Sequence, residues 1–285
     1  MKEKLFHTLS YLVLVSVIFT ACQASPAATA TPIPTAIPNT PTAEPTPMPE
    51  DPQITLYYDG NSQYEIISPQ GVRVLVDACW PTFLSSPATD QDILLTTHNH
   101  ADHYTASFAQ SFPGQQLSIE TGEIKVKDVA IRGIMAGHGL TNFAAAGSPN
   151  VIFIIDVAGI RIVDFGDFGQ ESLTPELASV LGEVDIAISI LGNTAFFQKI
   201  TDEKTIFTFM GQLKPRLIIP TAHADTATVG YATEQWQGFY SDAKSVTIRL
   251  SDLSGNTKFL MLGTLAISYH NLYGLPSWAT STASR

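Results

Sequence analysis

The sequence predicts an α/β domain in which two β-sheets are covered by helices on their outer faces. Two features of the 285-residue chain lead to this prediction. Strand-like segments dominate the folded part at first, and helix-like and strand-like segments alternate after about residue 175. Charged residues make up 14% and apolar residues 45%, as in a compact enzyme. Roughly 220 residues remain beyond the N-terminal segment, which is long enough for one sizeable core.

The first 21 residues have the organisation of a secretory signal. A basic start is followed by a mostly apolar run over residues 5–19 and by small residues directly before Cys22. The run is short and is soon followed by polar sequence, which argues against a transmembrane helix. Residues 19–22 resemble the lipobox of bacterial lipoproteins, in which the cysteine after the cleavage point receives a lipid. Phe19 departs from the Leu that is usual at this place.

We therefore expect residues 1–21 to be a lipoprotein signal peptide. The mature chain would then be anchored through Cys22 on the outer face of the bacterial cytoplasmic membrane. An ordinary signal peptide or an uncleaved anchor is the alternative. Residues 22–52 are rich in Pro, Thr and Ala, which cannot bury a core and which favour an extended linker. Cys22 and Cys79 could instead form a disulfide, since the chain contains two cysteines.

The chain is acidic, with a formal net charge of −11. Removal of residues 1–21 takes away two Lys and one Glu, which leaves about −12. Binding to nucleic acid depends on Lys and Arg at the phosphates, so nucleic acid is not an expected partner. A local metal pair could still attract an anionic substrate. The oligomeric state is not determined by the sequence.

Many short strand-like segments make up the first part of the domain. The turn at Asp59-Gly60-Asn61 and the Pro69 and Gly71 pair separate the opening strands and predict antiparallel reversals. The predicted strands here are 54–58, 64–68, 72–77, 92–96, 116–119, 124–126, 129–135, 151–157 and 160–165. A helix is expected over 104–112, where Pro113-Gly114 ends it.

Helical and strand patterns alternate in the remainder of the domain. The predicted helices are 175–181, 202–213 and 233–240, and the predicted strands are 185–190, 216–219 and 245–250. We expect the folded domain to span residues 53–275 and residues 276–285 to form a loose tail.

A cluster of three His and one Asp follows the apolar strand at 92–96. The cluster is His98-Asn99-His100-Ala101-Asp102-His103. A strand end is a rigid platform, and residues two apart in an extended segment point to one side, as His98 and His100 would. Imidazole and carboxylate are the usual ligands of zinc and similar ions. The cluster therefore predicts a metal site.

This motif resembles the signature of the metallo-β-lactamase superfamily, and further segments resemble that family in the same order along the chain. They are 60–66 with 74–77, the strand 92–98, Ala136-Gly137-His138, the strand 159–167 that ends in Gly-Asp, and the strand 217–223 that ends in His223. The short Gly-Asn-Ser start looks most like the L-ascorbate-6-phosphate lactonase-like branch. The resemblance covers roughly residues 54–250 and implies a four-layer αββα sandwich.

The resemblance also implies a ligand set for two divalent ions. His98, His100 and His138 would hold the first ion, Asp102, His103 and His223 the second, and Asp167 would bridge them. Asp77 would support a ligand by a hydrogen bond. Asp164 is the alternative to Asp167, but the Gly directly before Asp167 favours the latter. His270 lies beyond the matched region and His7 in the signal, so neither is expected to be a ligand.

The implied activity is hydrolysis of a small lactone, ester or phosphoester by a hydroxide that the two ions activate, with Asp102 and Asp167 as catalytic residues. Zinc is the expected metal, and manganese and iron remain open. A His at position 100, where an iron-dependent oxidoreductase branch has Glu, favours hydrolysis. Pocket candidates are Asn142, Phe143, Asn193, Phe196 and Phe197. The alternatives are a phospholipase D-like lipid phosphodiesterase and a non-catalytic metal- or solute-binding lipoprotein.

Overall fold

Two β-sheets form the centre of the fold in the part of the chain that the structure describes. The computed structural model describes residues 50–138, 149–168, 172–191, 200–221, 226–263 and 266–278. The chain divides by its contacts into residues 1–46 and 47–285, and every described residue belongs to the second unit. Among the described residues, no helix has both the length and the apolar content needed to cross a membrane.

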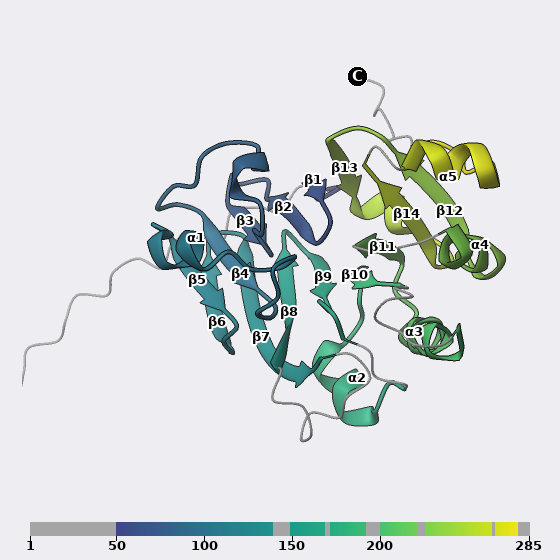
Figure 1. The fold of residues 1–285 in the computed structure, drawn as a ribbon, viewed down its shortest axis with the longest axis horizontal. Coiled ribbons are helices and arrows are strands. Elements are labelled where there is room, and N and C mark those ends of the chain that lie inside the picture. The colour runs from purple at the N-terminus through teal and green to yellow at the C-terminus, as the bar shows by residue number, and fades with distance from the viewer. Residues whose placement is uncertain are drawn as a thin grey trace, which may run out of the picture. The chain divides into compact units, whose positions relative to one another are not determined.

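The first sheet has six strands, three of which run parallel to one another. Its strands are β1 (Gln53–Gly60), β2 (Gln63–Ile67), β3 (Arg73–Val76), β4 (Ile93–Thr96), β5 (Gln115–Ser118) and β13 (Ser245–Arg249). They are ordered β13-β1-β2-β3-β4-β5 (Figure 1). Because β3, β4 and β5 pair in parallel, their C-terminal ends lie at the same edge of the sheet.

The second sheet has eight strands. They are β6 (Gly122–Val126), β7 (Val129–Gly137), β8 (Pro149–Val157), β9 (Ile160–Asp164), β10 (Ile186–Ile190), β11 (Leu217–Thr221), β12 (Gln237–Ser241) and β14 (Lys258–Leu262). Their order is β12-β14-β11-β10-β9-β8-β7-β6. Strands β7 and β9 are both antiparallel to β8, and β9, β10 and β11 are parallel, so β7, β9 and β11 end at one edge.

Helices cover the outer face of each sheet, which confirms the predicted four-layer αββα sandwich. The helices are α1 (Ala106–Ser111), α2 (Pro175–Leu181), α3 (Ile200–Leu213), α4 (Thr226–Gln235) and α5 (Ala266–Tyr273). Helix α1 lies on the opposite side of the sheets from α3 and α4 (Figure 1). Local sequence sets the ends of α2, because Thr174 accepts the N–H of Leu177, Pro175 begins the first turn, and Gly182 follows with φ 65°.

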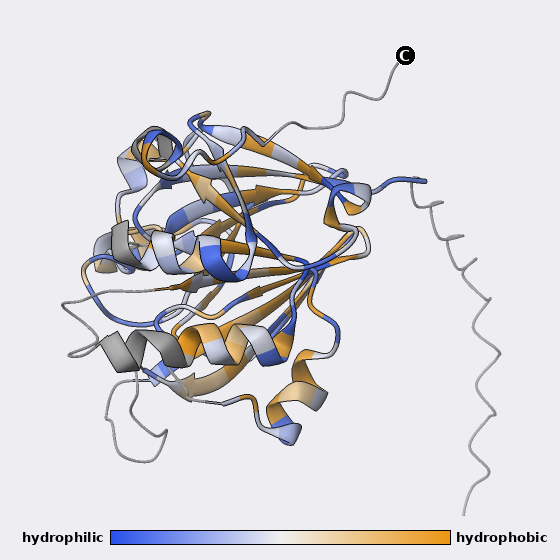
Figure 2. Ribbon diagram, turned by 90° about the vertical axis from the view of Figure 1, so that its right-hand side faces the viewer, coloured by the Kyte–Doolittle hydropathy of each residue, from blue (hydrophilic) through white to orange (hydrophobic). Residues whose placement is uncertain are grey.

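Three apolar clusters hold the four layers together. The largest lies between the two sheets and includes Ile66 and Ile155. A second packs the other face of the eight-stranded sheet against the helices around Phe209, and a third packs Leu94 against Ala109 of α1. The strands consequently read as apolar along much of their length (Figure 2), because most are covered on both faces. Each fully buried large apolar side chain contributes about 1.5–3 kcal/mol.

The expected strands of the first half agree with the structure to within two residues at each end. The expected helix over 233–240 is wrong, because α4 ends at Gln235 and β12 follows over Gln237–Ser241. Gly238 explains this change, since a Cβ there would lie 2.3 Å from Cζ of Phe259 on β14, so a glycine allows β12 to pack closely. Strand β14 and helix α5 were not among the predicted elements.

The C-terminal tail begins later than expected. Ser277 forms an isolated parallel bridge with Tyr240 of β12, and the N–H of Trp278 donates to the carbonyl of Tyr240 at 2.8 Å. The Trp278 ring meets Phe239 edge-on at 5.4 Å between centroids. Residues 276–278 are therefore part of the folded domain, and residues 279–285 lie outside the described part of the chain.

Candidate metal centre

Strand ends from both sheets bring the predicted ligands together at one edge. Strand β4 ends at Thr96 and leads directly into His98, while β7 ends one residue before His138. Strand β9 ends three residues before Asp167. Because β7 and β9 run in the same direction, His138 and Asp167 reach the same edge although 29 positions separate them.

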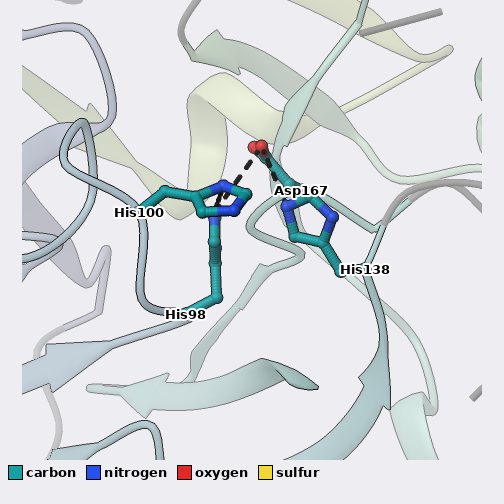
Figure 3. Close-up of side chains that lie close together, drawn as sticks. All are labelled: His98, His100, His138 and Asp167. Carbon is teal, nitrogen blue, oxygen red and sulfur yellow. Dashed lines mark hydrogen bonds and ion pairs between the residues drawn. The ribbon is translucent and has the colours of Figure 1, made fainter. Parts of the chain in front are cut away.

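Three imidazoles and one carboxylate form the first donor cluster. One ligand atom each from His98, His100, His138 and Asp167 lies within 4.8 Å of the others. Nε2 of His98 is 3.1 Å from Nδ1 of His100, and Oδ2 of Asp167 is 3.7 Å from Nε2 of His98 and 3.6 Å from Nε2 of His138. The four side chains point toward one another (Figure 3). The sequence predicted all four as ligands.

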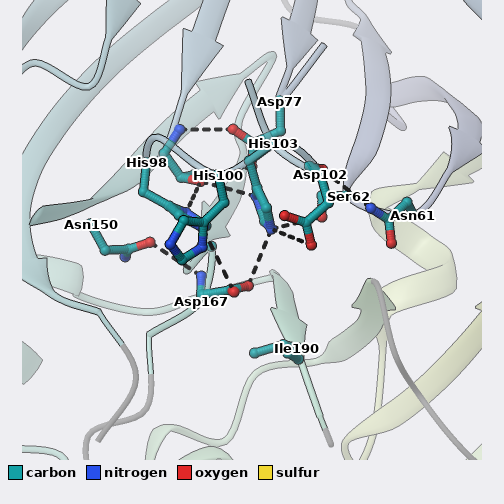
Figure 4. A network of polar contacts seen from close by, with 12 residues as sticks. Asn61, Ser62, Asp77, His98, His100, Asp102, His103, Asn150, Asp167 and Ile190 are labelled. Carbon is teal, nitrogen blue, oxygen red and sulfur yellow. Dashed lines mark hydrogen bonds and ion pairs between the residues drawn. The ribbon is translucent and has the colours of Figure 1, made fainter. Parts of the chain in front are cut away.

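A second group of donors surrounds Nε2 of His103. Oγ of Ser62 lies 2.9 Å from this nitrogen, Oδ1 of Asp167 lies 3.3 Å from it, and Oδ2 of Asp102 lies 3.9 Å from it (Figure 4). The two oxygens of Asp167 therefore face different groups, Oδ2 toward the first cluster and Oδ1 toward His103. A carboxylate in this position can bridge two ions.

Asp77 fixes the position of His103 from behind. Its Oδ2 lies 2.7 Å from Nδ1 of His103, and its two oxygens accept the backbone N–H and the hydroxyl of Thr97 at 2.7 and 2.8 Å. An Nδ1–H that donates to a carboxylate leaves Nε2 as the atom that faces an ion. Oγ1 of Thr97 is 3.0 Å from Nδ1 of His98 and 3.3 Å from Nδ1 of His103, so one residue contacts both imidazoles.

The turn between β9 and Asp167 needs a glycine. Gly166 has φ 52°, and a Cβ there would lie 2.5 Å from Oδ1 of Asn150 and 2.8 Å from Cβ of Thr97. Asn150 holds this turn because its Oδ1 accepts the N–H of Asp167 and its amide donates to the carbonyl of Phe165. The Gly-Asp pair thus lets the backbone approach the histidine motif closely enough for Asp167 to face both donor groups.

Asp164, the alternative bridging residue, is directed elsewhere. Its side chain is buried, and its Oδ1 accepts the N–H of Gly166 at 3.0 Å. Burial and the nearby charge of Asp77 raise the pKa of Asp164 to about 7. Tyr64 lies beside it, and burial together with the charges of Asp164 and Asp77 raises the pKa of Tyr64 well above its ordinary value. Asp164 therefore helps to hold the turn at Gly166 and belongs to neither donor cluster.

The electrostatics of the first cluster suit a metal ligand. Burial, with the charge of His103 and other neighbouring histidines, lowers the pKa of His98 to about 2, so its imidazole is neutral. Burial alone would lower the pKa of His103, but Asp77 and Asp167 outweigh it and raise that pKa to about 11. Burial would raise the pKa of Asp167, but His103 and His138 hold it well below its usual range.

Sequence reasoning did not assign Asn61 and Ser62 to the site. They form the turn between β1 and β2, in which Asn61 has φ 55°. The side-chain amide of Asn61 donates to the backbone carbonyl of Asp102 at 3.2 Å, and Ser62 is buried against His103. About 40 positions separate the turn from the motif, and its composition predicts only a reversal, so no local signal could have found this contact.

Several predicted residues fall outside the described part of the chain. These are His7, Cys22, Asn142, Phe143, Asn193, Phe196, Phe197 and His223. Strand β11 ends at Thr221, two residues before His223. His270 is described, and Nδ1 of its ring lies 2.6 Å from the carbonyl oxygen of Leu275, while the ring stacks on Tyr240. Cys79 is a buried free thiol, and burial with the charge of Asp77 raises its pKa to about 12.

The donor set fits divalent transition ions. Neutral imidazole and carboxylate ligands suit zinc, manganese and iron. Buried His98 and His103 are each oriented by Thr97 or Asp77, as is usual for metal-binding histidines. The side chain of Asp102 is 35% exposed, so the second donor group has a side that is open to solvent. The residues therefore fit an ion at the first cluster and a further ion beside His103.

Comparison with known proteins agrees with this fold. Residues 55–222 match the family model described as the beta-lactamase superfamily domain. This match covers more than half of the chain, and the chain belongs to the metallo-β-lactamase superfamily. No curated protein has a sequence similar enough to match this one.

Several solved structures are similar to this chain at low sequence identity, and one of them aligns with a TM-score above 0.5. A Thermotoga maritima protein of the metallo-beta-lactamase superfamily is 17% identical and aligns with a TM-score of 0.54, over 74% of this chain and 100% of that one. The metallo-beta-lactamase fold protein YhfI from Bacillus subtilis is 13% identical. It aligns with a TM-score of 0.44 over 70% of this chain and 99% of that one. CmlA, a diiron beta-hydroxylase from Streptomyces venezuelae, is 12% identical. It aligns with a TM-score of 0.46 over 76% of this chain and 54% of that one.

Proposed function

We propose that this protein is a metal-dependent hydrolase that uses two divalent ions to cleave a lactone, ester or phosphoester bond in a small molecule. The observation that supports this most strongly is the placement of Asp167. Its Oδ2 faces His98 and His138 at 3.7 and 3.6 Å, and its Oδ1 faces His103 at 3.3 Å. One carboxylate whose two oxygens face two different groups of imidazoles is suited to binding a pair of ions. A single ion would not need this arrangement.

Each ion would have its own ligands. His98, His100 and His138 would hold the first, His103, Asp102 and His223 the second, and Asp167 both. Two bound divalent ions would supply an activated nucleophile by lowering the pKa of water between them and would polarise the bond that is attacked. Zinc is the proposed metal, with manganese and iron as the alternatives.

The chain's own residues orient the ligands and handle the proton. Asp77 keeps Nδ1 of His103 protonated and Thr97 orients His98, so both rings direct Nε2 inward. Asp102 is the acidic residue of the site with the greatest exposure, so it can accept a proton and pass it to solvent. Asn61 holds the backbone of Asp102, which keeps this carboxylate beside His103.

Metal content is the test of this proposal. Elemental analysis of the purified chain without a histidine tag should find about two equivalents of zinc or manganese. Activity should then be measured on aryl esters, lactones and phosphodiesters, with the Asp167→Ala variant as the inactive control. Hydrolysis of phospholipid headgroups alone would favour the lipid phosphodiesterase. Two ions without hydrolysis of any of these substrates would favour a metal- or solute-binding lipoprotein.

We further propose that a lipid on Cys22 anchors the protein at the outer face of the cytoplasmic membrane. The support is the signal-like sequence of residues 1–21 and the Pro/Thr-rich segment that follows Cys22. Radiolabelled fatty acid should be incorporated into the protein and lost in Cys22→Ser. Cys79→Ser should keep the label, because Cys79 is buried. Labelling of both variants, or of neither, would reject the anchor.

A further inference from the structure

The turn between β1 and β2 directs a buried hydroxyl at the candidate second ion. Ser62 is 2% exposed, and its Oγ lies 2.9 Å from Nε2 of His103, the nitrogen that faces away from Asp77. Among the described residues, His103 is the polar partner that the structure gives to this hydroxyl. We propose that Ser62 supplies an oxygen ligand to the ion held by His103, an inference that rests on the proposed two-metal function.

The spacing of the donors supports this role. Atoms that bind the same zinc ion at 2.0–2.2 Å lie about 3–3.5 Å apart. Around Nε2 of His103, Oδ1 of Asp167 at 3.3 Å lies within this range, Oγ of Ser62 at 2.9 Å is just below it, and Oδ2 of Asp102 at 3.9 Å is above it. The hydroxyl is thus as well placed to bind the ion as the predicted carboxylates are.

Burial makes the argument stronger. An ion bound to Nε2 of His103 occupies the atom that now pairs with Ser62. A buried hydroxyl left without a partner destabilises the folded state, because it has lost its hydrogen bonds to water. Binding of the ion by Oγ removes this cost, because the hydroxyl exchanges one partner for another without leaving its position.

Two hydrogen bonds hold the turn that carries Ser62. The hydroxyl of Tyr58 donates to the carbonyl of Asn61 at 2.9 Å, and the amide of Asn61 donates to the carbonyl of Asp102 at 3.2 Å. Both contacts lie on the residue directly before Ser62. The second ties the turn to the histidine motif itself, so Ser62 and Asp102 approach the same nitrogen from neighbouring segments (Figure 4).

Cobalt titration of the full chain tests this assignment without an activity measurement. Ser62→Ala should bind the second equivalent of Co²⁺ at least about tenfold more weakly than the wild type, with the first equivalent unchanged. Ser62→Cys should add a thiolate-to-cobalt charge-transfer band in the near ultraviolet that grows with the second equivalent. Ser68→Cys is the matched control, because Ser68 is also buried near β2 but contacts Asp128.

The outcomes separate this inference from the proposed function. Two equivalents in the wild type, with the band present in Ser62→Cys and absent in Ser68→Cys, support direct binding by Ser62. Two equivalents in the wild type with no band in Ser62→Cys overturn the role of Ser62 but leave the two-metal function intact. Binding of only one equivalent of Co²⁺ by the wild type overturns both the role of Ser62 and the two-metal function. Thermal unfolding of each variant with chelator present shows that it is folded.

Discussion

Asp77 and His103 form a buried pair in which Oδ2 of the carboxylate lies 2.7 Å from Nδ1 of the imidazole. The same carboxylate accepts two hydrogen bonds from Thr97, which directly precedes His98. One acidic residue at the end of β3 therefore sets the orientation of one predicted ligand and the position of the strand end that carries another. This relationship leads to the first prediction.

Asp77→Asn should weaken binding of the ion held by His103 by about 10- to 100-fold, because the charge that orients the imidazole is lost while the side chain keeps its size. A competitive titration with a chromophoric chelator measures this affinity. Asp90→Asn, which removes an exposed carboxylate, should leave it unchanged. Equal affinities in the two variants would show that Asp77 has no influence on the metal.

Substitution of single ligands should remove ions selectively. His138→Ala should lose the first ion and His103→Ala the second, whereas Asp167→Ala should lose both, since its two oxygens face different groups. Elemental analysis after gel filtration measures the number of ions per chain. If Asp167→Ala kept as many ions as His138→Ala, the bridging role would be wrong.

Gly166→Ala should destabilise the fold by about 3 kcal/mol or more, through strain at positive φ and a clash with Thr97 and Asn150. Chemical denaturation measures the free energy of unfolding. Gly255→Ala is the matched control, because Gly255 has φ 89° and nothing lies within 4 Å of its Cβ position. That variant should lose only about 1 kcal/mol. Similar losses in both would mean that the close approach to Thr97 has no energetic consequence.

The contribution of Asp164 to the stability of the protein should fall as the pH rises from about 4 to about 7. Asp164 has its pKa raised from 3.8 to about 7, so the folded state holds this proton over a range in which the unfolded state releases it. Unfolding then releases a proton, and stability decreases by at most about 1.4 kcal/mol per pH unit for this one group.

Asp164→Asn isolates that contribution, because Asn carries no charge at either end of the range. The free energy of unfolding of the variant, measured against pH with chelator present, should fall less steeply than that of the wild type between pH 4 and 7. Parallel curves for the two proteins would show that Asp164 is ionised in the folded state throughout.

The C-terminal segment 276–278 should contribute to stability. A chain that ends at residue 275 loses the backbone bonds to Tyr240 and the contact of Trp278 with Phe239, and should be less stable by about 1–3 kcal/mol. A chain that ends at residue 278 is the control, and its melting temperature should equal that of the full chain. Equal melting temperatures for the full chain and both shortened chains would show that residues 276–278 add no stability and belong to the loose tail.

The strands and the histidine motif could be predicted from sequence because their signals are local, whereas His138 and Asp167 were implied by the family resemblance. Short apolar segments between turn residues marked β1 to β9, and the spacing of His98, His100 and His103 marked a metal motif. The helix expected over 233–240 failed because its pattern is weak, and because close packing of Gly238 on Phe259 favours a strand there. Packing across a sheet overrides local propensity, and the local sequence does not contain it.

By itself the sequence determined the class of fold, the order of its elements up to about β11, and the chemical type of the site, since apolar segments and a dense His/Asp motif are properties of short stretches of chain. Only the tertiary structure decided how the oxygens of Asp167 divide between two groups, that Asp164 lies beneath the turn, and that Ser62 meets His103. These relationships join residues from different strands. Their distances depend on sheet order, register and the close approach at Gly166, which arise only when the whole chain has folded.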